Sequence, residues 1–205
     1  MQKIMFNDRY GLTDAVIDYI KNNTRRIEGG EQFQRAATSA EDFTYEEATG
    51  CIVMCCQGIE IFRHKCRYKV GEVVAVAQSY ERIGVPPQHY ISRPDIDGYQ
   101  IISKHKGWRN KMYVSADLML HQIRITGIRC ERLQDISDED CVKEGVRVGS
   151  QALEYPYYFI DTKQFLICDY KSPRRAFAAL IDKVSGRGTW DRNPWVVAYE
   201  FELVK

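Results

Sequence analysis

The sequence lacks any long run of apolar residues, and it has almost no excess of charge of either sign. Its apolar stretches are far shorter than the roughly 20 residues of a membrane-spanning helix, and residues 1–10 show no signal-peptide pattern. The 29 basic and 28 acidic residues give a net charge of +1, which argues against strong non-specific binding to nucleic acid but allows a local basic cleft. We therefore expect a cytoplasmic protein without a membrane partner.

The common catalytic and cofactor motifs are also missing. There is no G-x-S-x-G, H-E-x-x-H, P-loop or G-x-G-x-x-G motif, and the four histidines are scattered. Seven cysteines lie at irregular spacings, which fits reduced thiols better than a disulfide framework. The group from Cys51 to Cys66 contains no C-x-x-C pair, and the adjacent Cys55 and Cys56 could not easily face one ion from a strand. We expect no metal and no cofactor.

What the sequence does contain is a substantial apolar core pattern, with 44% hydrophobic and 28% charged residues. Alternation or continuous apolar character predicts strands at Val73–Ala77, Ile123–Arg129 and Trp195–Leu203, all in one curved sheet. Helices are predicted at Thr13–Lys21 and Pro173–Val184, outside that sheet. There is no internal repeat and no regular alternation of strands and helices. The prediction is an α+β domain built around a mixed, partly closed β-barrel.

Two further segments have recognisable local patterns. Ser137 precedes three acidic residues and is a good N-cap for a short helix that ends near Gly145. Cys51–Cys56 and the residues from Ile59 read as a hairpin with its turn at Gln57-Gly58. The polar stretch 42–50 is compatible with a loop or a short helix, and residues 31–69 as a whole are the least regular part of the chain.

The run from Arg129 to Asp140, R-C-E-R-L-Q-D-I-S-D-E-D, resembles the phage and prophage branch of the ASCH domains, which are relatives of the PUA domain. The resemblance recurs in the same order at four other places: Lys21–Arg26, Arg67–Tyr80, Gly107–Val114 and Trp190–Leu203. It implies one PUA-like domain over residues 1–205, a mixed β-barrel with flanking helices, with a variable insertion around 31–69. It also implies binding of RNA or a nucleotide.

The ASCH signature G-x-K-x-x-E-x-R, in which this branch often has threonine for the acid, falls on residues 19–26. Lys21, Thr24 and Arg26 match it, and Tyr19 replaces the glycine. One interpretation is an anion- or carbonyl-binding corner formed by these residues with Arg25. The other is that Lys21 complements a helix dipole while the two arginines are solvated. The resemblance favours the first.

A second basic segment, residues 104–113, combines Lys104, His105, Lys106, Arg109 and Lys111 with Trp108 and Tyr113. Aromatic side chains beside a positive groove hold single-stranded nucleic acid without reading its sequence. The alternative is an exposed loop that Trp108 anchors to the core, since one aromatic is not a stacking platform. Both interpretations stay open, and the first adds Trp108, Arg109 and Lys111 to the expected ligand-binding residues.

The favoured function is a binding module for RNA or a modified nucleotide, with its basic cleft at the barrel mouth. Some ASCH proteins hydrolyse acetylated cytidine with a lysine, a threonine and a glutamate, and others are described as ribonucleases. Lys21 and Thr24 match the first two of these roles. The resemblance therefore also allows a small hydrolase, and a third possibility is a prophage-derived structural or regulatory protein.

Arg124 argues against hydrolysis. In those enzymes the glutamate lies in a strand I-E-V-T, and the corresponding run here is Ile123-Arg124-Ile125-Thr126. A guanidinium stays protonated, so it cannot shuttle a proton as a carboxylate does, but it can bind an anion. We therefore count Arg124 among the ligand-binding residues and expect poor amidohydrolase activity. A carboxylate could still come from a neighbouring strand, for which the candidates are Glu72, Glu131 and Glu200.

Overall fold

The structure is a computed structural model that describes residues 1–84, 106–149, 157–161 and 167–204. In these residues the chain is mixed α+β, as the sequence predicts. None of their helices is long and apolar enough to cross a membrane. Lys104 and His105, the first two residues of the predicted basic segment, lie outside the described residues.

Contacts within the chain divide it into two compact units. The smaller unit comprises Met1–Phe6, Val73–Ile123 and Val204–Lys205, and the larger one comprises Asn7–Glu72 and Arg124–Leu203. The prediction of one ASCH-type domain over residues 1–205 stays a prediction.

Five strands form a sheet in the order β1-β6-β7-β11-β2. Their bounds are Lys3–Ile4, Val73–Val76, Gln122–Arg132, Trp195–Leu203 and Asn23–Arg26. β1, β6 and the first residues of β7 belong to the smaller unit, and β7 continues into the larger unit beside β11 and β2. The three predicted strands, β6, β7 and β11, therefore share one sheet. The strand order is open in the described part of the chain, so the barrel stays a prediction.

In the smaller unit, β1 pairs in parallel with β6, whose Val74, Ala75 and Val76 are fully buried. The short helical segments of this unit are α3 (Tyr80–Ile83), η2 (Lys111–Tyr113) and η3 (Ala116–Leu118). Tyr80 and Ile83 of α3 pack with Ala75, Val114 and Met119 to form a small core, and Trp108 and Ala116 lie against it. The continuous apolar run of β6 is thus covered by apolar residues of the same unit.

In the larger unit, β11 pairs antiparallel with β2, with Val197 opposite Arg26 and Glu200 opposite Asn23. Val196 and Ala198 are as deeply buried as Val197 and Tyr199. The sequence predicts one buried face for β11, so its first half departs from that prediction. The alternating positions 196 and 198 are themselves apolar, and this explains why both faces of that half can be covered.

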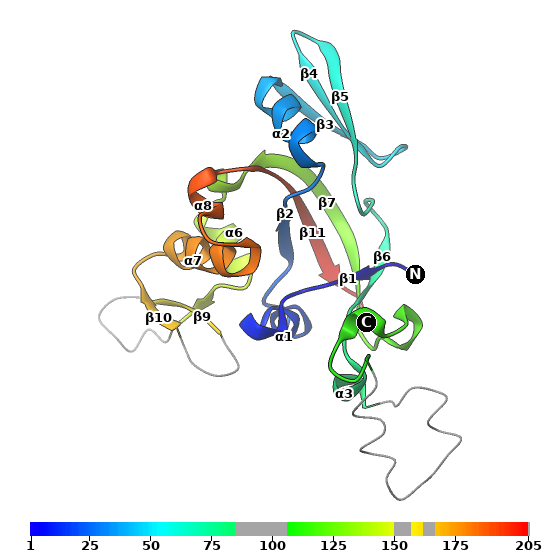
Figure 1. Ribbon diagram of the computed structural model, residues 1–205, viewed down its shortest axis with the longest axis vertical. Coiled ribbons are helices and arrows are strands. Elements are labelled where there is room, and N and C mark those ends of the chain that lie inside the picture. The colour runs from blue at the N-terminus through cyan, green and yellow to red at the C-terminus, as the bar shows by residue number, and fades with distance from the viewer. Residues whose placement is uncertain (85–105, 150–156, 162–166, 205) are drawn as a thin grey trace, which may run out of the picture. The chain divides into compact units, whose positions relative to one another are not determined.

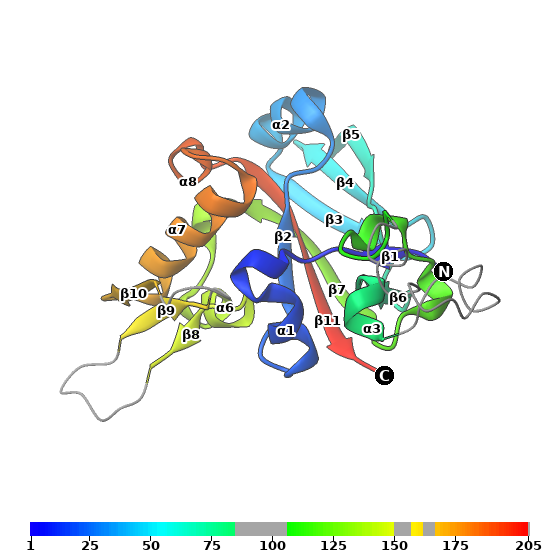
Figure 2. The same cartoon turned by 60° about the horizontal axis from the view of Figure 1, so that its bottom comes forward.

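The helical segments of the larger unit are η1 (Asp8–Tyr10), α1 (Leu12–Ile17), α2 (Gly30–Ser39), η4 (Leu133–Asp135), α6 (Asp138–Lys143), α7 (Pro173–Ser185) and α8 (Thr189–Arg192). Ser137 and Ser172 cap α6 and α7 through their side chains, and this confirms both predicted starts. α7 packs against α6 (Figure 2).

The helix α1 is shorter than predicted. It ends at Ile17 rather than Lys21, and the N–H groups of Ile20 and Lys21 both donate to the oxygen of Ala15. Tyr19, the residue before Ile20, has φ +60, a left-handed conformation that stops a helix. Tyrosine rarely adopts this conformation, so the sequence gives little indication of the stop, and the predicted helix extends beyond the observed end.

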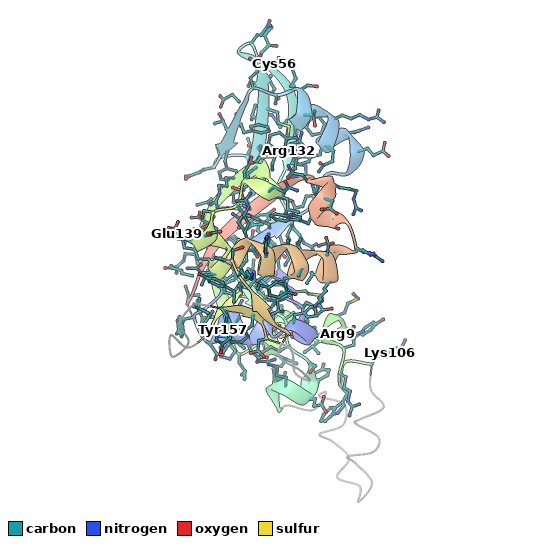
Figure 3. The ribbon with its side chains drawn as sticks, turned by 90° about the vertical axis from the view of Figure 1, so that its left-hand side faces the viewer. Arg9, Cys56, Lys106, Arg132, Glu139 and Tyr157 are labelled. Carbon is teal, nitrogen blue, oxygen red and sulfur yellow. The ribbon has the colours of Figure 1, made fainter. Side chains whose placement is uncertain are left out.

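Residues 31–69 contain α2 and an antiparallel three-stranded sheet, β3-β4-β5, with bounds Asp42–Glu46, Cys51–Cys56 and Ile59–Lys65. The predicted hairpin is confirmed, with positive φ at Gln57 and Gly58. Residues 42–46 are a strand, not the loop or short helix expected from their polarity; an edge strand tolerates polar residues on its exposed side. Figure 1 shows α2 beside this sheet, and Figure 3 marks the outer end of the hairpin at Cys56.

A second small sheet, β10-β9-β8, is formed by Ile167–Tyr170, Tyr158–Ile160 and Arg147–Val148. The sequence gives these short segments no regular pattern, and none of them was predicted as a strand. Isolated runs of two to four residues are too short for periodicity to identify.

Candidate functional site

Lys21 lies between α1 and β2, and its side chain is buried. Its ammonium donates to the backbone oxygen of Asn23 at 2.6 Å, to the backbone oxygen of Glu144 at 2.9 Å and to Glu144 Oε2 at 2.6 Å. Only 1% of the side chain is exposed. In this position the ammonium is one half of a buried ion pair.

Arg25 follows on β2 and is held by three carboxylates. Its guanidinium donates to Glu131 at 2.5 Å, to Asp140 at 2.8 Å and to Glu144 at 3.1 Å, and its side chain is 0% exposed. Asp140 and Glu144 are four residues apart at α6, and this spacing puts both on one helical face. The cap at Ser137 fixes where that helix starts, and therefore where its two carboxylates lie.

Arg129 on β7 extends the cluster toward the surface. It donates to Glu131 at 2.7 Å, to Asp140 at 2.5 Å and also to Glu200. We call the resulting cluster the charge network: Lys21, Arg25, Arg129, Glu131, Asp140, Glu144 and Glu200. Each of its cations has at least one carboxylate partner.

The electrostatics of the charge network follow from burial and pairing. Burial lowers the pKa of Lys21 below its usual value, although Glu144 acts to raise it. Burial acts to raise the pKa of Asp140, but the hydrogen bond and positive charge of Arg25 outweigh this and leave that pKa lowered. An added anion would have to displace a carboxylate from these cations. The charge network is therefore a poor site for phosphate.

The structure thus corrects the open cleft predicted around Lys21. Lys21 and Arg25 are buried among carboxylates. Successive residues of a strand face opposite sides, so Thr24 and Arg26 face away from the carboxylates that hold Arg25. Thr24 is buried as well, and Arg26 is half-buried, close enough for its charge to lower the pKa of Lys21. The signature residues do not line one open cleft.

Glu144 is the functional candidate that sequence reasoning missed. Of the three carboxylates considered as neighbours, Glu131 and Glu200 are in the charge network, but neither is the one that contacts Lys21. Glu72 instead accepts the N–H of Lys69. The available indication was its position four residues after Asp140 on a well-capped helix, which puts the two acids on the same face.

Arg124 lies apart from this cluster. Ile123 and Ile125 are fully buried, so the intervening Arg124 faces the exposed side of β7, where it pairs with Glu202 at 2.9 Å. About half of each side chain is exposed. Arg124, predicted as a ligand-binding residue, is therefore part of a surface ion pair.

The three predicted ligand-binding residues of the other basic segment belong to the smaller unit. Trp108 packs against the core of that unit, as in the interpretation that makes it a loop anchor. Arg109 pairs weakly with Glu81 at 3.6 Å, and Lys111 donates to the oxygen of Phe6. Their role in ligand binding stays a prediction.

A row of exposed cations lies where β5 ends and the chain continues toward β6. Lys65, Arg67 and Lys69 are exposed, while the intervening Cys66 and Tyr68 are buried. We call these three cations the basic stripe. In the described part of the chain no carboxylate pairs with any of their side chains, whereas the preceding Arg63 pairs with Glu46 and Glu60.

The basic stripe is anchored from inside by aromatic residues. The N–H of Arg67 donates to the hydroxyl of Tyr199 at 3.1 Å, and the rings of Tyr68 and Tyr199 meet edge to face at 5.3 Å. Glu28 accepts from the Tyr199 hydroxyl and lies 3.4 Å from His64. Buried polar contacts thus fix the backbone of the stripe while its cations point to solvent.

A hollow of about 90 Å³, which we call the slot, opens beside the stripe. It is lined by Phe43, Thr44, Tyr45, Ile52, Ile128, Arg129 and Cys130. The Tyr45 hydroxyl accepts the N–H of Val70 at 3.1 Å, which joins one end of the slot to the chain that carries the stripe. At the other end the rings of Phe43 and Trp195 pack in a tilted arrangement with centroids 4.8 Å apart, and the Arg132 guanidinium lies 4.6 Å from the centroid of the same indole.

Two of the thiols are kept protonated by burial. Burial raises the pKa of Cys66 and of Cys130 to about 12, so both stay protonated near neutral pH. Among the described residues no three or more histidines, cysteines or acids are grouped to hold a metal ion.

Comparison of the chain with protein-family models, with curated proteins and with solved structures finds no match. The resemblance to ASCH domains therefore rests on the residues quoted above, among which Tyr19 departs from the signature. The signature gives that position to glycine, and here the tyrosine has φ +60 with 76% of its surface exposed. A left-handed conformation is the one for which glycine is the natural choice.

Proposed function

We propose that this chain is an ASCH-type, PUA-like module that binds single-stranded RNA or a nucleotide. Two features support the family assignment: the ordered sequence resemblance, and the left-handed backbone at the position where the signature has glycine. The proposal moves the contact surface from Lys21 to the basic stripe and the slot, because the cations at Lys21 are already neutralised.

The observation that carries the proposal is the unpaired character of the basic stripe. Alternate residues of a chain lie at most roughly 7 Å apart, which lets neighbouring cations reach successive phosphates of one strand. A cation with no carboxylate partner gives up no ion pair when it binds phosphate, and it releases counterions from the strand. The aromatic residues at the slot supply the second element of single-strand recognition.

The test is a titration of fluorescent single-stranded RNA with wild type and with Lys65→Gln/Arg67→Gln/Lys69→Gln. Each lost phosphate contact lowers the salt dependence by about 0.7, so the triple variant should lose about two units of slope and bind far more weakly. The matched control is Arg175→Gln/Lys183→Gln/Arg187→Gln, which removes three exposed cations from α7 and its C-terminal end. Equal losses of RNA affinity in both variants would show that binding depends on net charge and not on the position of the cations, which would contradict the proposal.

One observation favours a second candidate, amidohydrolysis of the ASCH type. The Glu144 carboxylate lies 2.6 Å from the Lys21 ammonium. It could take the role of the glutamate that those enzymes have at the position of Arg124. A lysine and a glutamate in contact can exchange a proton, as general acid–base chemistry requires. Incubation with acetylcytidine, following cytidine release, tests it. Turnover that is lost in folded Lys21→Met and in folded Glu144→Gln would support it, and no release by wild type would reject it.

A further inference from the structure

We infer that the slot receives one unpaired, single-ring nucleobase and reads it with backbone groups of β3 and β7. This inference rests on the proposed function, because the basic stripe is what brings the strand to the slot. It adds a base-size preference to a surface that otherwise recognises only the phosphate backbone.

The walls of the slot are strand edges. Three consecutive residues of β3, from Phe43 to Tyr45, and three of β7, from Ile128 to Cys130, line it. Successive side chains of a strand point to opposite faces, so a wall made by three residues in a row includes the edge of the strand. Strand edges present alternating N–H donors and C=O acceptors.

Both edges are open in the described part of the chain. β3 is the outer strand of its sheet. On β7, the N–H of Ile125 donates to the oxygen of Glu72, immediately before β6 begins, and the chain preceding Glu72 turns at Gly71 toward Tyr45. Residues 128–130 therefore extend past the strand that pairs with the earlier part of β7. Their backbone groups on that side are available to a ligand.

The size of the slot decides which kind of base it takes. A cavity of about 150 Å³ holds benzene in an apolar protein interior. The slot has about 90 Å³, less than that cavity, but its mouth is open, so a six-membered ring enters it in part, with the rest of the ring and the attached sugar outside. The fused rings of a purine would leave still more of the base outside. The aromatic side chains of Phe43 and Tyr45 provide flat contact surface for such a ring.

The charge of the slot favours a neutral base over a phosphate. Arg129 lines it, but its guanidinium is already held by Glu131, Asp140 and Glu200. Cys130 contributes a protonated thiol. The uncompensated cations lie outside the slot, where Tyr45 accepts the N–H of Val70 and Lys69 is the residue immediately before Val70. A nucleotide can therefore put its base in the slot and its phosphate at the basic stripe.

The experiment compares oligouridylate, oligocytidylate and oligoadenylate of equal length on the full chain. Wild type should prefer the two pyrimidine strands by about ten-fold, the scale of one base contact. Thr44→Phe fills the slot from an exposed position on β3 and should abolish the preference while stripe-dependent binding remains. Thr126→Phe, an exposed position on β7 that does not line the slot, is the matched control and should leave the preference intact.

Each result of this experiment either supports or overturns the inference. Free oligoadenylate stacks on itself, so the preference counts only if Thr44→Phe removes it. Cys130→Phe fills the slot from β7 and gives the same answer if Thr44→Phe does not fold. Equal binding of all three strands, lost in the stripe variant, would overturn the inference and keep the proposed function. No binding of any strand would overturn both.

Discussion

The charge network and the basic stripe contain the same kinds of side chain but are opposites in environment. Arg25 has no exposed surface and three carboxylate partners, whereas Arg67 is exposed and has no carboxylate partner in the described residues. The first arrangement holds β2, β7 and α6 together, and the second leaves charge free for a ligand. A run of cations in a sequence therefore indicates a binding site only when the distribution of acids around it is known.

Burial explains why the two regions should respond differently to mutation. Removing one partner of a buried ion pair leaves an uncompensated charge in a medium that solvates it poorly. Removing an exposed cation costs little, since water and salt already screen it. Stability should therefore depend on the charge network and binding on the basic stripe.

The largest expected effect is the loss of Arg25. Arg25→Met removes the shared partner of Glu131, Asp140 and Glu144 and leaves these acids facing one another. We expect a loss of about 3–5 kcal/mol in the free energy of unfolding, measured by urea denaturation. Arg35→Met is the matched control, because its pair with Glu31 is over 80% exposed, and it should change stability by less than about 0.5 kcal/mol.

Urea denaturation of the basic-stripe variants tests whether the stripe, unlike the charge network, contributes little to stability. Each of Lys65→Gln, Arg67→Gln and Lys69→Gln should stay within about 0.5 kcal/mol of wild type. A stripe variant as unstable as Arg25→Met would mean that these cations hold the fold together, and the proposed binding surface would lose its support.

The next effect in size is the coupling between Lys21 and Glu144. A double-mutant cycle of Lys21→Met and Glu144→Gln should give an interaction energy of about 1–3 kcal/mol, because the two groups share one buried hydrogen-bonded pair. Unfolding in denaturant supplies all four values. The same cycle on Arg124 and Glu202, an exposed pair, should give no more than about 1 kcal/mol. Similar energies in both cycles would show that burial is not what distinguishes these regions.

Much of the fold was predictable because its determinants are local. The cap at Ser137, the proline after Ser172 and the turn at Gln57-Gly58 each fix an element through neighbouring residues. Elements that depend on their surroundings were missed. Residues 42–46 alternate polar residues with Phe43 and Tyr45, which is compatible with a strand, but the pairing with β4 is what distinguishes it from a loop or a short helix.

The candidate site divides in the same way. The acids that bury Lys21 and Arg25 come from more than 100 residues away, so no local pattern could reveal them. The basic stripe, by contrast, was visible: the run R-H-K-C-R-Y-K from Arg63 to Lys69 alternates cations with residues that can be buried.

A smaller effect appears in acid. The charge of Arg25 leaves the pKa of Asp140 below 3.8, its usual value, although burial opposes the shift. Unfolding frees Asp140 to bind a proton at its usual pKa, so its stabilising contribution is present above about pH 4. It is lost as the pH falls through the lowered pKa. Asp140→Asn should flatten the stability curve below pH 4, measured by thermal unfolding, whereas Asp138→Asn, on the exposed first turn of α6, should leave the curve unchanged.

The smallest expected effect concerns Tyr19, where the chain enters the charge network. A left-handed conformation costs an ordinary residue about 1–2 kcal/mol, and glycine avoids that cost but loses more chain entropy on folding. Tyr19→Gly should therefore raise the free energy of unfolding by about 0.5 kcal/mol. Tyr19→Ala keeps the backbone strain and removes only an exposed ring, so it should change little. If glycine destabilises the chain relative to alanine, the position does not need a left-handed residue. The match between Tyr19 and the signature glycine would then be accidental, and the ASCH assignment would rest on sequence resemblance alone.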